Sequence, residues 1–145
     1  MRRRHPVFVC LILALTLIAI PAAGEEAGIC VRDAWVRETP PGMAMTAGYM
    51  VLQNKTSRPQ ALVAASSSDF ETVTIHRTVA RQGMTGMEHS PEIELLPNAS
   101  LLFAPGEYHL MLQNPKRTLR AGDRVEIHLR FRGGLDLPVA YEVRK

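Results

Sequence analysis

Short runs of strand-forming residues, each closed by proline, glycine or asparagine, constrain the fold of this chain more than any other feature. In segment 124–132, Val125, Ile127, Leu129 and Phe131 alternate with charged or polar neighbours, as in a strand with one buried face. We find no convincing 3.6-residue apolar stripe of the kind that marks a helix. The expected strands are 29–37, 47–53, 61–65, 72–79, 93–96, 100–103, 108–113, 124–132 and 137–143. Eight or nine short strands of this kind predict an all-β sandwich or barrel.

The first 24 residues have the pattern of a secretory signal peptide. Arginines at 2–4 precede an uncharged apolar run at 6–20, and small residues follow at 21–24. The apolar run has about 15 residues, whereas a membrane-spanning helix needs about 20. An uncleaved membrane anchor is the alternative. We therefore expect cleavage after residue 23 or 24, export to the periplasm, and one domain over residues 25–145.

The net charge of +3 belongs to the N-terminal segment rather than to the domain. Three of the 17 basic residues and none of the 14 acidic residues lie within 1–24, so the rest of the chain is formally neutral. Nucleic-acid binding needs a basic face, which a neutral domain of this composition does not indicate. We expect contact with the membrane only through the signal peptide or through membrane-bound partners.

Cys30 is the single cysteine that remains once Cys10 leaves with the signal peptide. Neither cysteine follows a convincing lipobox, which argues against a lipoprotein. One cysteine cannot form an internal dithiol, which argues against a thiol–disulfide reductase. Because Cys30 stands at an apolar strand start, we expect it to be a small buried hydrophobic residue; a reactive thiol or a metal ligand is the alternative.

Histidine and methionine are the residues that point to a function. The chain has no Gly-rich phosphate loop, no HExxH and no GxSxG, so nothing indicates an enzyme. His109 and Met111 stand two apart on one expected strand, so their side chains share a face. His76 lies on its own strand, and Met87 follows a turn-like segment. These four side chains could meet at one end of the sandwich, although methionines in β cores are more often space-fillers.

A set of two imidazoles and two thioethers suits Cu(I). Thioether sulfur is a soft ligand that favours Cu(I) over harder divalent ions, and imidazole also binds copper. All four ligands are neutral, which favours a monovalent ion over Zn²⁺. The spacing alone permits a metal site but does not require one.

The spacing of all four residues is a more specific pattern than the His109-x-Met111 pair alone. Ten residues separate His76 from Met87, and twenty-one separate Met87 from the His109-x-Met111 pair. This pattern resembles the HX10MX21HXM motif of the PCu(A)C family of periplasmic copper chaperones. The similarity extends through residues 29–143 and includes 33–42, 105–112 and 119–123.

The resemblance implies a cupredoxin-like Greek-key β-sandwich or barrel. It also implies Cu(I) bound by His76, Met87, His109 and Met111, and delivery to cuproproteins, above all the CuA centre of cytochrome c oxidase subunit II. A Sco-type copper chaperone is an expected collaborator. We expect no histidine- and methionine-rich tail of the kind that some relatives have, because the last residues up to Lys145 include neither residue type.

Several neighbouring residues have more than one interpretation. Glu88 either strengthens cation binding or is solvated, and His89 is either an exposed loop histidine or an auxiliary ligand. Met84 is either a neighbour of the site or a substitute ligand. Met43 and Met45 are expected in core or turn packing, with a second weak soft-metal site as the alternative.

Three other functions compete with the chaperone. A scaffold or adhesion module would bind no stoichiometric metal. A blue-copper electron carrier would need a cysteine thiolate beside two histidines, and Cys30 lies far from them in the sequence. A thiol–disulfide reductase is the third and lacks its dithiol.

Overall fold

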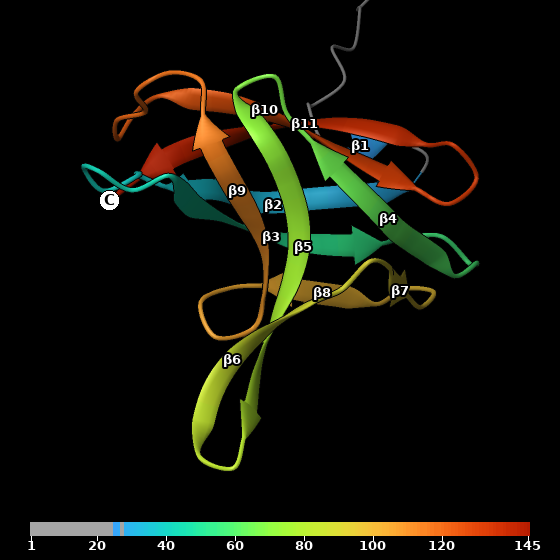
Figure 1. Ribbon diagram of the computed structural model, residues 1–145. Coiled ribbons are helices and arrows are strands. Elements are labelled where there is room, and N and C mark those ends of the chain that lie inside the picture. The colour runs from blue at the N-terminus through green and yellow to red at the C-terminus, as the bar shows by residue number, and fades with distance from the viewer. Residues whose placement is uncertain (1–24, 27) are drawn as a thin grey trace, which may run out of the picture.

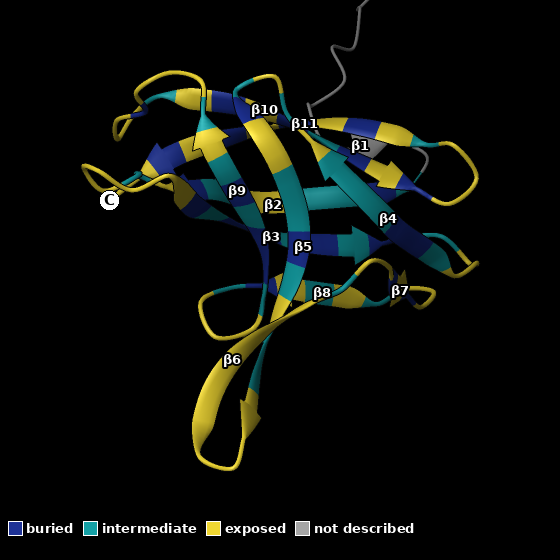
Figure 2. Cartoon of the chain, viewed as in Figure 1, coloured by how far each residue is buried: buried dark blue, intermediate teal, exposed yellow. Residues whose placement is uncertain are grey.

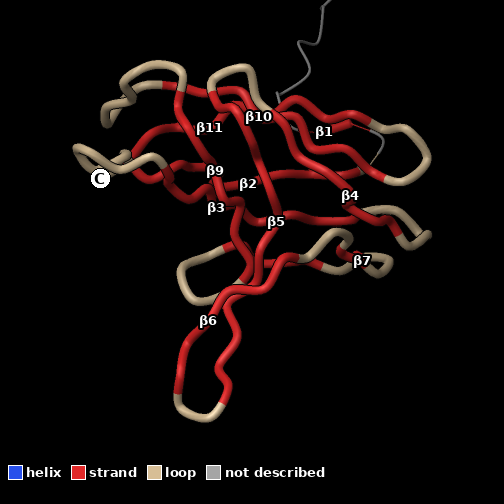
Figure 3. The backbone as a smooth tube through the Cα atoms, viewed as in Figure 1, coloured by secondary structure: helices blue, strands red, loops and turns tan. Residues whose placement is uncertain are grey.

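The computed structural model describes residues 25–26 and 28–145, and the structural statements below concern these residues. The expected signal peptide at 1–24 lies outside them. The described chain consists of strands joined by turns and loops (Figure 3). Within it, no helix has the length and apolar character that crossing a membrane requires.

Eleven strands form one mixed sheet among the described residues, in the order β6-β5-β9-β8-β3-β2-β11-β10-β4-β7. In addition, β1 pairs with β2, and β9 also pairs with β3. The strands are β1 (Glu25–Glu26), β2 (Ile29–Arg37), β3 (Met45–Asn54), β4 (Gln60–Ser66), β5 (Phe70–Arg81), β6 (Met84–His89), β7 (Ile93–Leu95), β8 (Ser100–Phe103), β9 (Tyr108–Pro115), β10 (Arg124–Phe131) and β11 (Asp136–Arg144).

The sheet folds over on itself, so that β5 and β9 cross in front of β2 and β3 (Figure 1). Most neighbouring strands are antiparallel, whereas β11 with β2 and β8 with β9 are parallel. The end of β5 and all of β6 form a hairpin that projects below the body of the molecule in this view (Figure 1). The topology therefore sets one two-stranded hairpin apart from the packed layers.

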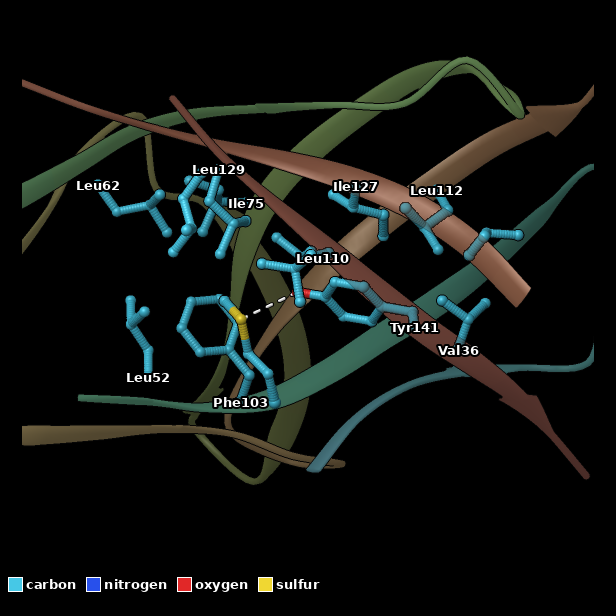
Figure 4. Close-up of a cluster of buried hydrophobic side chains, with 14 of the residues drawn as sticks. Val36, Leu52, Leu62, Ile75, Phe103, Leu110, Leu112, Ile127, Leu129 and Tyr141 are labelled. Carbon is cyan, nitrogen blue, oxygen red and sulfur yellow. Dashed lines mark hydrogen bonds between the residues drawn. The ribbon is translucent and has the colours of Figure 1, made fainter. Parts of the chain in front are cut away.

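The apolar core lies between the layers and takes side chains from alternate positions of the long strands. Along β10 and β11 buried and exposed residues alternate almost without interruption (Figure 2). Tyr141 is fully buried, and its hydroxyl donates a hydrogen bond to Met50 Sδ at 3.0 Å (Figure 4). Burial raises the pKa of the Tyr141 hydroxyl above its ordinary value of 10.0, so it remains a hydrogen-bond donor.

All nine expected segments are strands, with ends that differ by at most two residues. The prediction missed β1 and β6. All six residues of β6 are exposed, so the sequence has no apolar alternation there to mark a strand. Pairing with β5 defines this strand instead. Gln82 and Gly83, the two residues of the connecting turn, have φ values of 50° and 79°, as a tight hairpin turn requires.

The prediction that Cys30 is buried is wrong. Ile29 is fully buried and faces the core, whereas its neighbour Cys30 is a free, half-buried cysteine. Successive side chains of a strand point to opposite faces, which explains the difference. Cys30 pairs with Gln53, at the other end of β3 from Met45.

Candidate metal centre

Two adjacent strands place His76 and His109 side by side. The two residues are direct partners in the antiparallel pairing of β5 with β9, and their ring centroids lie 6.0 Å apart with an interplanar angle of 30°. Their chain neighbours Ile75 and Leu110 are buried in the core. The histidines therefore face away from the core on the other side of the sheet.

The hydrogen bonds of these rings leave one nitrogen of each without a partner. His109 Nδ1 donates to the carbonyl oxygen of Glu107 at 3.2 Å, and His76 Nε2 shares a hydrogen bond of 3.0 Å with Thr74 Oγ1. In the described part of the chain, His76 Nδ1 and His109 Nε2 are buried and have no hydrogen-bond partner. An unpaired buried polar atom costs about 1–3 kcal/mol, so it requires an explanation.

Metal coordination would account for this arrangement of one free and one hydrogen-bonded nitrogen in each ring. A histidine that binds a metal through one nitrogen commonly donates its other N–H to a backbone carbonyl or another acceptor. Glu107 provides such an acceptor for His109, and Thr74 can provide one for His76. His128, on β10, differs because both of its ring nitrogens contact carboxylates, at 3.1 and 3.2 Å.

The thioether of Met111 lies on the same face as these histidines. Met111 follows His109 by two residues on β9 and pairs with Thr74 on β5 and with Ala47 on β3. Its sulfur accepts a hydrogen bond of 3.3 Å from the side-chain amide of Gln113. This bond holds the sulfur in place and leaves a second lone pair for a ligand.

Met87 reaches the same face from the hairpin. Thr78 pairs with Met87 just as His76 pairs with His89, so these four side chains share one face of β5 and β6. Met87 is 63% exposed. Met87, His109 and Met111 all line one surface hollow, whereas His76 stands beside His109 without lining it.

The structure clarifies three residues near this site. His89 is exposed as expected, but it lies on β6 rather than in a loop, and its ring is 5.5 Å from that of His76. Met84 is 71% exposed beside the hairpin turn and does not line the hollow. Glu88 forms an exposed ion pair with Arg81, which agrees with its solvated interpretation. The auxiliary-ligand role of His89 stays a prediction.

Of the expected core or turn packing of Met43 and Met45, the core alternative is wrong, whereas the turn alternative agrees with Met43, whose amide donates to the carbonyl of Pro40. The two methionines are 54% and 46% exposed, and both line the hollow beside His109 and Met111. Sequence reasoning could not place them there, because the hollow forms only when β3 pairs with β9. Among the described residues, no group of three or more His, Cys, Asp or Glu side chains is arranged to hold an ion. The candidate donors are therefore imidazoles and thioethers.

Burial lowers the pKa of His76 below its ordinary value of 6.5, and the neighbouring His109 and His89 lower it further. The ring is consequently neutral near pH 7, and only a neutral imidazole can bind a metal.

We expect Cu(I) affinity to be nearly constant between pH 8 and 7 and to fall in acid, because burial and the neighbouring histidines place the pKa of His76 below its ordinary value and protons compete for the ring only below that pKa. Competitive Cu(I) titrations at about pH 8, 7, 6 and 5 measure this dependence. A steep loss of affinity already between pH 8 and 7 would contradict it.

We also expect Thr74→Val to weaken Cu(I) binding by about tenfold, since loss of a partner that orients a metal-binding histidine costs about 10–100-fold. Valine keeps the β-branched shape and removes the hydroxyl. Thr72→Val is the matched control, because Thr72 lies on the same strand and pairs with Gln113. Equal affinities for the two variants would count against a role of Thr74 in orienting His76.

The chain is similar to known proteins in sequence and in fold. The chain is 34% identical over 149 residues to "Putative lipoprotein Lxx21020" of Leifsonia xyli subsp. xyli, covering 97% of this chain and 89% of that protein. The solution structure of CuI-DR1885 from Deinococcus radiodurans is 33% identical, with a TM-score of 0.66 and coverage of 79% of this chain and 76% of that one. The copper-bound PCuAC domain from PmoF2 matches at a TM-score of 0.69 and 24% identity, covering 86% and 96%, and shows similarity of fold.

These matches confirm the all-β, cupredoxin-like fold and the resemblance to PCu(A)C copper chaperones. Both the family model and the Leifsonia relative are named for lipoproteins, which fits export and differs from the expectation of an unlipidated protein. The model of the LpqE-like family matches residues 29–143. This chain belongs to the LpqE-like family.

Proposed function

We propose that this protein is a periplasmic metallochaperone, not an enzyme, that binds one Cu(I) tightly with His76, Met87, His109 and Met111. The observation that carries the proposal is the pair of buried, unpaired ring nitrogens, His76 Nδ1 and His109 Nε2, on adjacent strands. The two thioethers are on the same face of the sheet.

The chemistry of the donors supports Cu(I) as the cargo. Two imidazoles and two thioethers are neutral and soft, and thioethers favour Cu(I) over harder divalent ions. Cys30 does not line the hollow, so no thiolate takes part there, and a blue-copper site would require one. The Cu(I) structure of the Deinococcus protein, at 33% identity, adds support from a relative.

The exposure of the donors suggests how the ion leaves. His109 is only 6% exposed, whereas Met87 is 63% exposed on a projecting hairpin. An incoming ligand from a partner therefore reaches the Met87 side first and displaces that weak thioether, and the remaining donors follow. This ligand exchange needs no redox change on the protein.

The recipient that we propose is the CuA centre of cytochrome c oxidase subunit II, with a Sco-type chaperone as collaborator. Support comes from the resemblance to PCu(A)C chaperones and from the signal-peptide pattern, which would bring the protein to the compartment that holds this centre.

Transfer to a purified CuA domain tests this function. Residues 25–145 are loaded with one equivalent of Cu(I) and mixed anaerobically with the apo CuA domain, and copper in each protein is measured after separation. We expect copper to move from wild-type protein to the CuA domain. Copper that stays on the chaperone, or that moves no faster than from a small-molecule complex, would contradict the proposed recipient.

A further inference from the structure

Two methionines outside the four-residue motif line the same surface hollow as three of the motif residues. Met43 and Met45 join Met87, Met111 and His109 around it, so four thioethers surround one depression. Exposed single apolar side chains are common on proteins and need no explanation. A group of four methionines around a candidate copper site is different, because each one adds a soft ligand at the same place.

The backbone near these methionines is fixed by hydrogen bonds. The amide of Met43 donates to the carbonyl of Pro40 at 3.1 Å, and the amide of Asn114 donates to the carbonyl of Ala44 at 2.7 Å. The hydroxyl of Thr46 donates to the carbonyl of Arg37 at 2.6 Å. These bonds tie Ala44, just before β3, to β9, and Thr46, at the start of β3, to β2. The exposure of the methionines is therefore imposed by the fold.

The register places Met45 next to the motif residue Met111. Met45 pairs with Gln113, whose side-chain amide donates to Met111 Sδ, and Ala47 pairs with Met111 itself. Residues two apart on a strand share a face, so Met45 stands one position beyond Met111 along the same surface. Cu(I) that approaches Met111 along this surface would meet the Met45 thioether first.

The charge around the hollow selects against divalent ions. Among the described residues that line it, Arg37 is the one that carries a charge, and none is an aspartate or glutamate. A positive neighbour opposes a divalent cation more strongly than a monovalent one, because the repulsion scales with ionic charge. Thioether ligands favour Cu(I) over harder divalent ions.

We propose that Met43 and Met45 form a second, weaker Cu(I) site at the mouth of the hollow, adjacent to the His–Met site. This inference rests on the proposed function, since the second ion position would serve as the entry point for the tightly bound ion. With two thioethers and no imidazole, it binds copper less firmly than the four-ligand site and fills after it.

The test is a Cu(I) titration of residues 25–145 followed by NMR of ¹³C-labelled methionine methyl groups under anaerobic conditions. The first equivalent is expected to shift the methyls of Met87 and Met111, and further Cu(I) those of Met43 and Met45. The buried Met50, at 1% exposure, is the internal reference and should not respond.

Variants separate the second site from the first. Met43→Leu/Met45→Leu keeps apolar bulk but removes both sulfurs, and it should abolish the second step while changing the affinity of the first by less than about twofold. Met84→Leu is the matched control, because Met84 is exposed but does not line the hollow, and it should retain both steps.

The outcomes distinguish this inference from the proposed function. If Met87 and Met111 respond but Met43 and Met45 do not, the second site is overturned and the chaperone stands. A second step that survives in Met43→Leu/Met45→Leu also overturns it. If Met87 and Met111 fail to respond to the first equivalent, the proposed function fails, and with it the role of Met43 and Met45 as an entry point.

Discussion

Replacing His109 with alanine is expected to lower the Cu(I) affinity by more than about a hundredfold. Loss of a group that only orients a metal ligand costs about 10–100-fold, and His109 would be a ligand itself. Its Nε2 is buried and unpaired, while its Nδ1–H donates to the carbonyl of Glu107, so the ring is held with one nitrogen free. Competitive titration against a colorimetric Cu(I) chelator measures the loss, and circular dichroism shows whether the fold persists.

His128→Ala is the matched control for this variant. His128 also lies on a strand, but both of its ring nitrogens contact carboxylates, those of Glu126 and Asp136. It should bind Cu(I) as wild type does. If a folded His109→Ala variant kept an affinity within about threefold of wild type, His109 would not be a ligand.

The second large effect is expected in the core rather than in the site. Leu129 is fully buried among the apolar side chains of the two layers, and its replacement by alanine should reduce the free energy of unfolding by about 2–5 kcal/mol (Figure 4). Burial of the leucine side chain is lost, and a cavity remains because neighbouring strands relax only partly. Urea denaturation monitored by circular dichroism measures the change.

Leu102→Ala provides the comparison, because Leu102 is 52% exposed on β8. A substitution at an exposed position such as this one is expected to change the free energy of unfolding by less than about 0.5 kcal/mol. If Leu129→Ala cost no more than Leu102→Ala, the alternating faces of β10 would be assigned incorrectly.

The strands of the body could be predicted from the sequence because each has one buried face. In β10, apolar residues alternate with polar ones in the sequence, and the apolar residues are the ones buried in the structure. The hairpin strand β6 lacks this signal, because its residues are all exposed and its pairing with β5 comes from a two-residue turn at Gln82 and Gly83. The motif spacing therefore identifies Met87 as a candidate ligand, whereas the residue pattern does not predict the strand on which it lies.

Parts of the candidate site depend on contacts that no sequence pattern contains. The spacing of His109 and Met111 predicts a shared face, but not that His109 Nδ1 donates to Glu107. The pairing of β5 with β9 and of β9 with β3 brings together residues far apart in the chain. The exposed position of Met45 follows from the pairing of β3 with β9, and that of Met43 from the turn before β3, which explains why neither residue packs in the core.

A competitive Cu(I) titration of residues 25–145, with Met87→Leu beside Met84→Leu, tests most directly whether the His–Met motif binds Cu(I). Both methionines are exposed residues of β6, but only Met87 lines the hollow with His109 and Met111. We expect one tightly bound equivalent for wild type and Met84→Leu, and clearly weaker binding for Met87→Leu. Equal binding by both variants, or no saturable binding by wild type, would contradict a Cu(I) site built on this motif.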